Sequence, residues 1–327
     1  MSFRYSIVLN LLGQLKDRFS VYQQVRTLEE KLAIACSVEG VTGVEMVFPD
    51  ELADIELTRD LLAKHNLRLS SVNVNLKGDP RWHQGALTAS DKATRAEAVR
   101  WIVRGMEIAA DLGSNLVTMC PLADGHDYPF EIDFNTPWNH FIQGVQSAAD
   151  SHPDVRLSLE YKASEPRAQV IIGTVGKTLY ACDQIDRANV GVTLDTGHAL
   201  FAGEHAAQSA ALLSQARKLF LVHGNDNYRN WDWDMVPGSV NFWDFLESTF
   251  YLMRDYDGWI AFDVSPSRFD PAQVMQCSVR MFRVAEAMVT QVGPEQIERS
   301  IVEGPMASMG LFLTFLEGRL QLRHVAG

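Results

Sequence analysis

The runs Val155-Arg-Leu-Ser-Leu-Glu160 and Val190-Gly-Val-Thr-Leu-Asp195 decide the fold, because each is a short apolar segment that ends in an acidic residue. Two later runs are similar: Leu219-Phe-Leu-Val-His223 ends in a histidine and Trp259-Ile-Ala-Phe-Asp263 in an acidic residue. Such runs, rich in Val, Leu, Ile and Phe, are typical of strands that are buried on both faces. The segments between them, 164–189, 199–218 and 235–258, are each long enough for a helix. This alternation predicts parallel strands with right-handed crossovers.

The last residue of each run is a candidate for chemistry, because the carboxyl ends of parallel strands converge on one site. We therefore predict a strand-end set that consists of Glu160, Asp195, His223 and Asp263. Three carboxylates and one imidazole are suitable ligands for a divalent cation. The predominance of oxygen ligands favours Mn²⁺, with Mg²⁺ or Co²⁺ as alternatives, over Zn²⁺ or Cu²⁺.

The rest of the chain predicts more units of one strand and one helix. Apolar runs predict strands at Phe3–Leu12, Gly43–Phe48, Arg68–Leu76 and Asn115–Pro121, and periodic segments predict helices at Thr27–Glu39, Ile55–His65, Asp91–Leu112, Trp138–Ser151 and Gln273–Val292. The eight units together predict an α/β fold, a single (β/α)₈ TIM barrel over 1–290. A helical tail is expected over 291–327, and its apolar run Met309–Leu322 is expected to pack on the barrel or on a neighbouring subunit.

Composition disfavours several classes of partner. The chain has 29 Lys and Arg against 41 Asp and Glu, a net charge of −12, and no basic run, which disfavours nucleic-acid and anionic-membrane binding. No apolar run reaches the length of a membrane span, and the first residues lack a signal-peptide pattern. Four scattered cysteines without Cys-x-x-Cys spacing predict reduced, buried thiols in a cytoplasmic protein.

Lys162 follows the first decisive run in the motif Glu160-Tyr161-Lys162. Alternation along a strand places Glu160 and Lys162 on the same side. A lysine beside metal-bound oxygens can donate a hydrogen bond to a substrate oxygen as negative charge develops there. The alternative is a solvated lysine at a strand end, since lysine is commonly exposed.

Two further motifs supply a loop set that consists of His198, Asp232 and Asp234. His198 belongs to Asp195-Thr-Gly-His198, where Gly197 allows a tight turn off the strand, and the two acids belong to Asp232-Trp-Asp234. The loop set is predicted to bind a second cation or to hold a water molecule. The alternatives are a helix-capping aspartate with a surface histidine and a solvated acidic turn.

Over about 155–266 these residues resemble the xylose-isomerase-like TIM barrels, which include sugar isomerases, ketose 3-epimerases and metal-dependent AP endonucleases. The motifs are most similar to the L-rhamnose isomerase and xylose isomerase branch. The resemblance implies that the strand-end set holds the first metal and that the loop set serves a second metal or a water. It further implies that Lys162 supports the interconversion of an unphosphorylated aldose and ketose by a 1,2-hydride shift. No Gly-rich phosphate loop is evident, which favours an unphosphorylated sugar. The expected substrate is a pentose, a 6-deoxyhexose or a branched sugar.

Other functions remain as alternatives. A ketose 3-epimerase using the same metal site ranks second and differs in its product. A DNA-repair nuclease is disfavoured by the charge and by the nine histidines, and a non-catalytic sugar sensor by the complete metal set. Aromatic candidates for a sugar-binding wall are Trp231, Trp233 and Trp243, with core or interface packing as the alternative, and candidates in the first-half loops that select the sugar are Phe48, Trp82, His126 and Trp138. The family tendency and the apolar tail together predict a homodimer or homotetramer.

Overall fold

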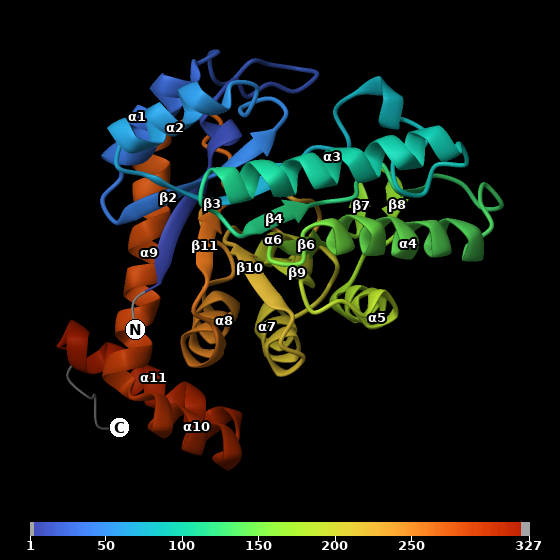
Figure 1. The fold of residues 1–327 in the computed structure, drawn as a ribbon. Helices are drawn as coiled ribbons and strands as arrows, with labels where there is room; N and C mark the ends of the chain where they lie inside the picture. The colour runs from blue at the N-terminus through green and yellow to red at the C-terminus, as the bar shows by residue number, and fades with distance from the viewer. Residues whose placement is uncertain (1–2, 322–327) are drawn as a thin grey trace.

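Eight parallel strands form a closed barrel in the computed structural model, which describes residues 3–321 (Figure 1). The barrel strands are β1 (Arg4–Val8), β2 (Val41–Phe48), β3 (Arg68–Val74), β4 (Leu116–Met119), β6 (Arg156–Glu160), β9 (Val190–Asp195), β10 (Leu219–His223) and β11 (Trp259–Phe262). Their order around the barrel is β1-β11-β10-β9-β6-β4-β3-β2, so strands that are neighbours along the chain pair with one another. The predicted (β/α)₈ barrel is confirmed.

Helices follow the strands and surround the barrel (Figure 1). They are α1 (Leu28–Ser37), α2 (Ile55–Lys64), α3 (Lys92–Asp111), α4 (Asn135–Ser151), α5 (Val175–Ile185), α6 (Thr196–Phe201), α7 (Ala206–Gln215), α8 (Phe242–Asp255) and α9 (Pro271–Val292). A capping box of Thr27 and Glu30 starts α1 by satisfying its first backbone N–H groups. In α3, Gly105 permits close packing on β3, since a Cβ there would lie 2.5 Å from the Val74 side chain.

The core of the barrel combines apolar packing with a short hydroxyl network. Phe282 of α9 is buried and packs edge-on or tilted against Tyr5, Phe245 and Phe262. The hydroxyl of Thr193 on β9 lies 2.7 Å from that of Ser158 on the neighbouring strand β6 and 2.8 Å from that of Thr118 on β4, the next strand beyond. Because all three hydroxyls are buried, their mutual hydrogen bonds offset the cost of removing them from water.

Two of the predicted helical segments are interrupted. Segment 164–189 begins with a hairpin, β7 (Ser164–Glu165) and β8 (Ala168–Val170), which pairs with β5 (Gly125–His126) before α5 starts. Pro166 and the β-branched residues that follow the hairpin disfavour a helix there. Segment 199–218 is divided between α6 and α7, because Gly203 takes a left-handed conformation (φ +75°) and ends α6.

The tail over 291–327 continues as α10 (Pro294–Glu303) and α11 (Pro305–Leu320), while 322–327, like 1–2, lie outside the described residues. Both helices pack on each other and on α9, and Figure 1 shows them extending away from the barrel near α8. Partly buried side chains of α11, among them Phe312 and Phe315, pack against the core. Val302 (88%) and Met306 (76%) are largely exposed, and contact with a second subunit stays a prediction.

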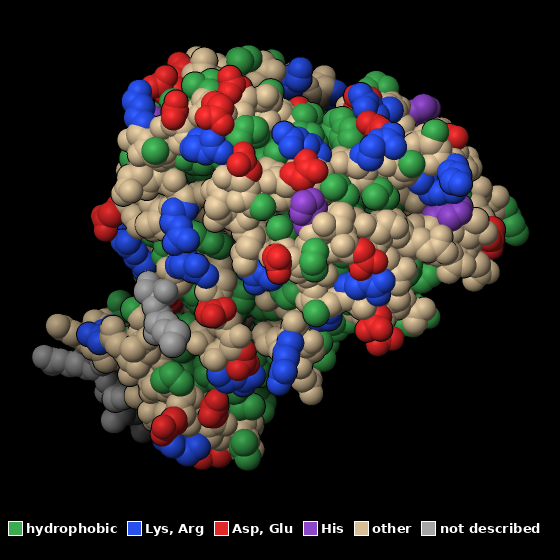
Figure 2. Space-filling model, viewed as in Figure 1, with side chains coloured by type: hydrophobic (Ala, Val, Ile, Leu, Met, Phe, Trp, Pro, Cys, Tyr) green, Lys and Arg blue, Asp and Glu red, His purple; other side chains and the backbone are tan. Residues whose placement is uncertain are grey.

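The described surface shows mixed charge and no membrane segment. Figure 2 shows Lys and Arg side chains interspersed with Asp and Glu over the face in view. Within 3–321, no helix is both long enough and apolar enough to cross a membrane. Cys120 and Cys182 are buried thiols as predicted, whereas Cys36 and Cys277 are exposed on outer helices, contrary to the expectation that all four cysteines are buried.

Candidate metal-binding active site

A polar pocket of about 210 Å³ opens at the carboxyl ends of the barrel strands. Five carboxylates line it, Asp50, Glu160, Asp232, Asp234 and Asp263, together with Asn10, Asn73, Asn75, Lys77, Cys120, Lys162, His198 and a few aliphatic side chains. Six of the predicted residues thus line one pocket, whereas Asp195 and His223 are not part of its wall. The pocket combines a high density of negative charge with two ammonium groups, which is an environment suited to a cation and a polar substrate.

The strand-end set comes together as the sequence predicted. One ligand atom from each of Glu160, Asp195, His223 and Asp263 lies within 4.8 Å of the others. His223 is the centre of this group, since its Nδ1 lies 3.2 Å from Glu160 Oε1, 3.4 Å from Asp263 Oδ2 and 3.8 Å from Asp195 Oδ2. The register explains the meeting, because His223 and Asp195 are directly opposite each other on β10 and β9.

Asp195 is held in place by its position at the start of α6. Its Oδ1 accepts a hydrogen bond from the His198 backbone N–H (2.8 Å), and its Oδ2 accepts one from the Asn225 side chain (2.9 Å). Gly197 lies against Asn225, whose Oδ1 would be only 1.9 Å from a Cβ at this position. Gly197 is therefore required by close approach inside α6, rather than by the tight turn that the sequence suggested.

His198 lies between the two groups of ligands. Its Nδ1 is 2.9 Å from the carbonyl oxygen of Tyr161, which can only accept, so Nδ1 carries a proton. Nε2 is then directed at Asp232 Oδ2, 3.1 Å away. Atoms of Asp195, His198 and Asp232 also lie within 4.8 Å of one another, which brings two members of the loop set beside the strand-end set. Asp234 lines the same pocket but, among the described residues, is outside that group.

The loop that carries Asp232 and Asp234 is tied down by Asp226. The Asp226 carboxylate accepts hydrogen bonds from the backbone N–H groups of Val240 and Asn241, and its backbone pairs with Met235 in an isolated bridge. Asp234 has a left-handed backbone (φ +47°) and accepts a hydrogen bond from the Ser265 hydroxyl (3.1 Å). Such a conformation costs free energy outside glycine and is common at functional sites.

Lys162 is buried in the pocket rather than solvated. Its Nζ forms an ion pair with Asp232 Oδ2 (2.9 Å) and a second one with Glu165 of β7. Burial disfavours the charged form, but Asp232 and Glu165 outweigh it and raise the pKa of Lys162 above its usual range. The hairpin β7–β8 therefore has a structural part in the site, since it supplies one of the two carboxylates that fix the ammonium group.

The carboxylates of the pocket oppose one another's ionisation. Burial raises the pKa of Asp195 to about 7, and nearby Asp232 and Glu160 add to the effect. Burial also raises the pKa of Asp234, with Asp232 and Asp263 contributing. Burial disfavours the charged form of His198 too, yet Asp195 and Asp232 raise its pKa to about 9. The polypeptide alone thus leaves the crowded negative charge only partly compensated.

The donor set fits a divalent cation. Oxygen atoms of three carboxylates and one imidazole nitrogen form the first group, which matches the preference of Mn²⁺ and Mg²⁺ for oxygen with room for nitrogen. Asp232 Oδ1 is buried and without a hydrogen-bond partner within the described residues. A buried carboxylate oxygen of this kind needs either a water or a cation.

Several residues of the site escaped the sequence analysis. Glu45 of β2 is fully buried beside His223, and Ser71 and Asn73 of β3 donate hydrogen bonds to it. A signal was available, because Ser71, Asn73 and Asn75 alternate with apolar residues at the strand period of two and therefore face the barrel interior together.

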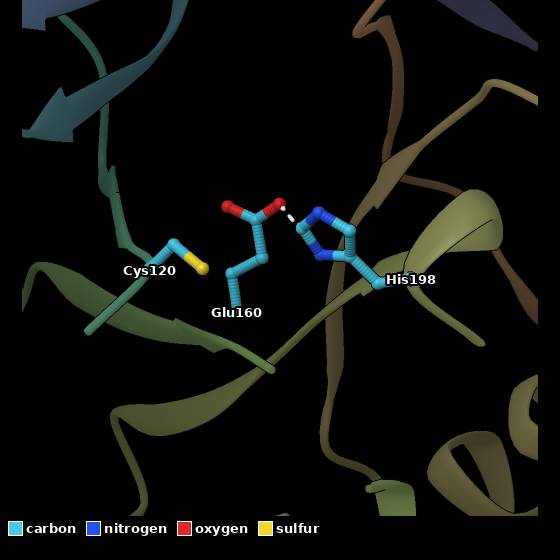
Figure 3. Close-up of side chains that lie close together, drawn as sticks. All are labelled: Cys120, Glu160 and His198. Carbon is cyan, nitrogen blue, oxygen red and sulfur yellow. Dashed lines mark ion pairs between the residues drawn. The ribbon is translucent and has the colours of Figure 1, made fainter. Parts of the chain in front are cut away.

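Cys120 was also missed. It follows β4, and Figure 3 shows its sulfur beside the Glu160 carboxylate, with His198 on the other side of that carboxylate. Glu160 Oε1 and His198 Nδ1 are 3.4 Å apart, the ion pair drawn in Figure 3. Burial raises the pKa of the Cys120 thiol well above its usual range, and Glu160 adds to this effect. Cys120 is therefore a neutral thiol in the pocket wall.

None of the seven aromatic candidates lines this pocket, which corrects the expected sugar-binding wall. Phe48, Trp82 and Trp101 pack on one another, with Trp82 fully buried, because the first-half loops close over their own core. His126 and Trp138 line a separate cavity of about 620 Å³ between β5 and α5. Trp231 packs between Phe201 and Trp233, and Trp243 lines an apolar groove beneath the tail.

Comparisons with known proteins give the class of this fold and site. Residues 34–284 match the model of the xylose isomerase-like TIM barrel family, and the chain belongs to that family. It is 28% identical over 198 residues to the xylose isomerase of Thermus thermophilus; the match covers 59% of this chain and half the length of that enzyme.

Solved structures have the same fold. A D-allulose 3-epimerase from Methylomonas sp., crystallised with D-allulose, is 20% identical, with a TM-score of 0.63 over 88% of this chain and 96% of that one. An L-ribulose 3-epimerase is 17% identical, with a TM-score of 0.65 over the full length of both chains. At these identities the likeness concerns the fold alone, so sugar isomerases and epimerases are both among the proteins similar to this chain.

Proposed function

We propose that this protein is a metal-dependent sugar isomerase that interconverts an unphosphorylated aldose and its ketose. One observation carries the proposal: Glu160, Asp263, His198, Asp232 and the buried Lys162 line a single pocket, and Asp195 and His223 lie within 4.8 Å of the first two. A second feature supports it, since the 28% identical relative is a xylose isomerase. Mn²⁺ is the cation we assign, with Mg²⁺ or Co²⁺ as substitutes.

The pocket indicates a small, hydroxyl-rich substrate. Its volume of about 210 Å³ is below the roughly 300–1,000 Å³ that is common for ligand sites. Asn10, Asn73 and Asn75 supply amide groups, which can both donate to and accept from sugar hydroxyls. A pentose, a 6-deoxyhexose or a branched sugar in its open-chain form matches these properties.

In the proposed reaction each residue has a distinct task. A divalent cation bound by Glu160, Asp195, His223 and Asp263 would polarise the substrate carbonyl and acidify the neighbouring hydroxyl. Asp232 and His198 hold one of two things: the proton released from the C2 hydroxyl, or a water molecule that accepts this proton. The hydrogen on C2 then moves to C1 as a hydride with its bonding electrons, which leaves a carbonyl at C2 and negative charge on the C1 oxygen, and the Lys162 ammonium stabilises that oxygen. Return of the proton to the C1 oxygen completes the ketose.

Ketose 3-epimerisation is the second candidate. Glu160 and Asp263 belong to the same group of facing carboxylates, and two carboxylates can remove and return a proton at a carbon next to a carbonyl. The Asp232–Lys162 pair has no evident task in that reaction, which is why the isomerase ranks first.

Product analysis separates the two reactions. Chelator-treated enzyme would be incubated in D₂O with tetroses, pentoses, 6-deoxyhexoses and branched sugars, with and without Mn²⁺, and the products read by NMR. We expect metal-dependent aldose–ketose conversion with little deuterium at C1, as a direct hydrogen shift requires. Ketose C3 epimers that carry solvent deuterium would replace the isomerase with the epimerase, and no turnover with any sugar of the panel would contradict both.

Metal removal is expected to lower thermal stability. The buried carboxylates repel one another without a cation, so a cation that binds only the folded protein stabilises it by about 2.7 kcal/mol at a concentration of about 100 Kd. We expect a higher melting temperature in MnCl₂ than in EDTA, measured by differential scanning calorimetry. Equal melting temperatures in both solutions at a saturating Mn²⁺ concentration would argue against the metal site.

A further inference from the structure

We propose that Glu45 is a positioning residue that orients His223 and fixes its tautomer, so that Nδ1 is presented to the metal. The inference rests on the proposed function in one respect, namely that the strand-end set binds a divalent cation. Glu45 comes from β2 and His223 from β10, two strands that are separated in the barrel by β1 and β11, and both side chains are fully buried.

The contacts of Glu45 define its role as an acceptor. The hydroxyl of Ser71 donates to Glu45 Oε2 (2.6 Å), and the side-chain amide of Asn73 donates to Oε1 (2.8 Å). His223 Nε2 lies 3.1 Å from Oε2. Both carboxylate oxygens therefore have donors, which is the pattern of an ionised carboxylate.

The tautomer of His223 follows from this contact. An ionised carboxylate can only accept a hydrogen bond, so His223 Nε2 must carry the proton that it donates to Glu45. The lone pair of a metal-binding imidazole is then on Nδ1, and Nδ1 is the atom that faces Glu160, Asp195 and Asp263. A carboxylate on the far nitrogen also increases the basicity of the ligating nitrogen.

The charge environment argues against a purely structural Glu45. Among residues 3–321, no lysine or arginine lies within ion-pair distance of its carboxylate, and His223 is its one titratable partner. A buried carboxylate with so little compensation costs free energy, whereas a leucine or glutamine could fill this space. We infer that the charge is retained for its effect on His223.

Two other buried carboxylates outside the strand-end set, Glu51 and Asp124, have different partners. Glu51, which is also buried, forms an ion pair with Lys31 and accepts a hydrogen bond from the Val47 backbone, with no contact to the strand-end set. Asp124 accepts from Ala86 and Thr88 and holds two loops together. Glu51 consequently serves as a matched control, because it is a buried glutamate whose carboxylate does not contact a proposed metal ligand.

The test measures metal binding, not turnover. Wild type, Glu45→Ala, Glu45→Gln and the control Glu51→Gln would be titrated with MnCl₂, and the free ion followed by electron paramagnetic resonance. Loss of an outer-shell partner typically weakens metal binding by about 10–100-fold, which we expect for Glu45→Ala. Glu45→Gln keeps an oxygen acceptor without the charge, so its loss should be smaller, and Glu51→Gln should bind Mn²⁺ as wild type does.

A spectroscopic readout distinguishes orientation from general damage. In ¹⁵N-labelled, Mg²⁺-loaded protein, the buried His223 Nε2–H is expected to give a slowly exchanging imidazole resonance, assigned by its absence in His223→Gln. The resonance should persist in Glu45→Gln and Glu51→Gln and disappear in Glu45→Ala, while the backbone spectrum stays folded. A Glu45→Ala protein that keeps both the resonance and wild-type Mn²⁺ affinity would overturn the inference.

These measurements separate the inference from the proposed reaction. If wild type binds Mn²⁺ and responds to Glu45→Ala as expected but converts no sugar, the positioning role holds and the isomerase proposal fails. If the wild-type protein binds no Mn²⁺ at all, the proposed metal site and the proposed role of Glu45 are both wrong.

Discussion

Replacing Asp263 with asparagine is expected to abolish high-affinity Mn²⁺ binding and to lower kcat/KM by about a thousandfold, equivalent to about 4 kcal/mol of lost transition-state stabilisation. The substitution keeps the size of the side chain but removes one negative charge from the group around His223 Nδ1, which is 3.4 Å away. Asp263 follows β11 directly and is only partly buried, so the barrel should tolerate the change. Calorimetric Mn²⁺ titration and aldose turnover would measure the two effects.

Asp270→Asn is the matched control for this change. Asp270 caps the start of α9 by accepting from the Gln273 backbone, and asparagine caps helices as well as aspartate does. The control therefore removes the same charge seven residues away, and we expect wild-type metal binding. Full activity of the Mn²⁺-saturated Asp263→Asn enzyme would show that the assignment of the strand-end set is wrong.

The strand ends could be predicted from sequence because two local regularities coincide there. Each decisive run is continuously apolar, so its strand is recognisable, and parallel strands bring their last residues to one rim whatever the detailed packing. No knowledge of strand register was needed to predict the site residues Glu160, Asp195, His223 and Asp263. Their meeting within 4.8 Å also depends on the register, which places His223 beside Asp195.

Glu45 and Glu165 could not be found in this way, for different physical reasons. Glu45 lies in the middle of β2, where its contact with His223 depends on which strands are opposite each other across the barrel. Glu165 lies in a hairpin of a few residues, and its ion pair with Lys162 depends on how that hairpin folds back over the site. Long-range register and short insertions leave little trace in hydrophobic periodicity.

The aromatic candidates show that the sequence also does not predict which residues a large side chain packs on. A tryptophan in a loop predicts burial of a large apolar surface but not the neighbour that it packs on. Trp82 is buried in its own half of the barrel, and Trp243 packs under the tail, a segment whose fold the strand pattern does not determine. The resulting pocket is polar, and this shifts its expected specificity toward hydroxyl contacts.

The second large effect is expected at Lys162, where a substitution should slow the reaction without weakening metal binding. Lys162→Met is expected to lower kcat by about 100–1,000-fold, the usual cost of removing one donor that stabilises a developing oxyanion. Methionine preserves most of the buried volume, so the hairpin and β6 should remain folded. Mn²⁺ should bind at least as tightly as in wild type, because the change removes a positive charge 2.9 Å from Asp232.

This combination of results distinguishes Lys162 from a metal ligand and from a structural lysine. Steady-state kinetics at saturating Mn²⁺ should show a fall in kcat with KM nearly unchanged, since the ammonium group interacts most strongly in the transition state. Lys177→Met on α5 is the control, because Lys177 is exposed and lines the neighbouring cavity instead of the catalytic pocket. Wild-type kcat in folded Lys162→Met enzyme would leave the lysine without a catalytic role, and parallel loss of Mn²⁺ affinity would instead place it in the support of the metal site.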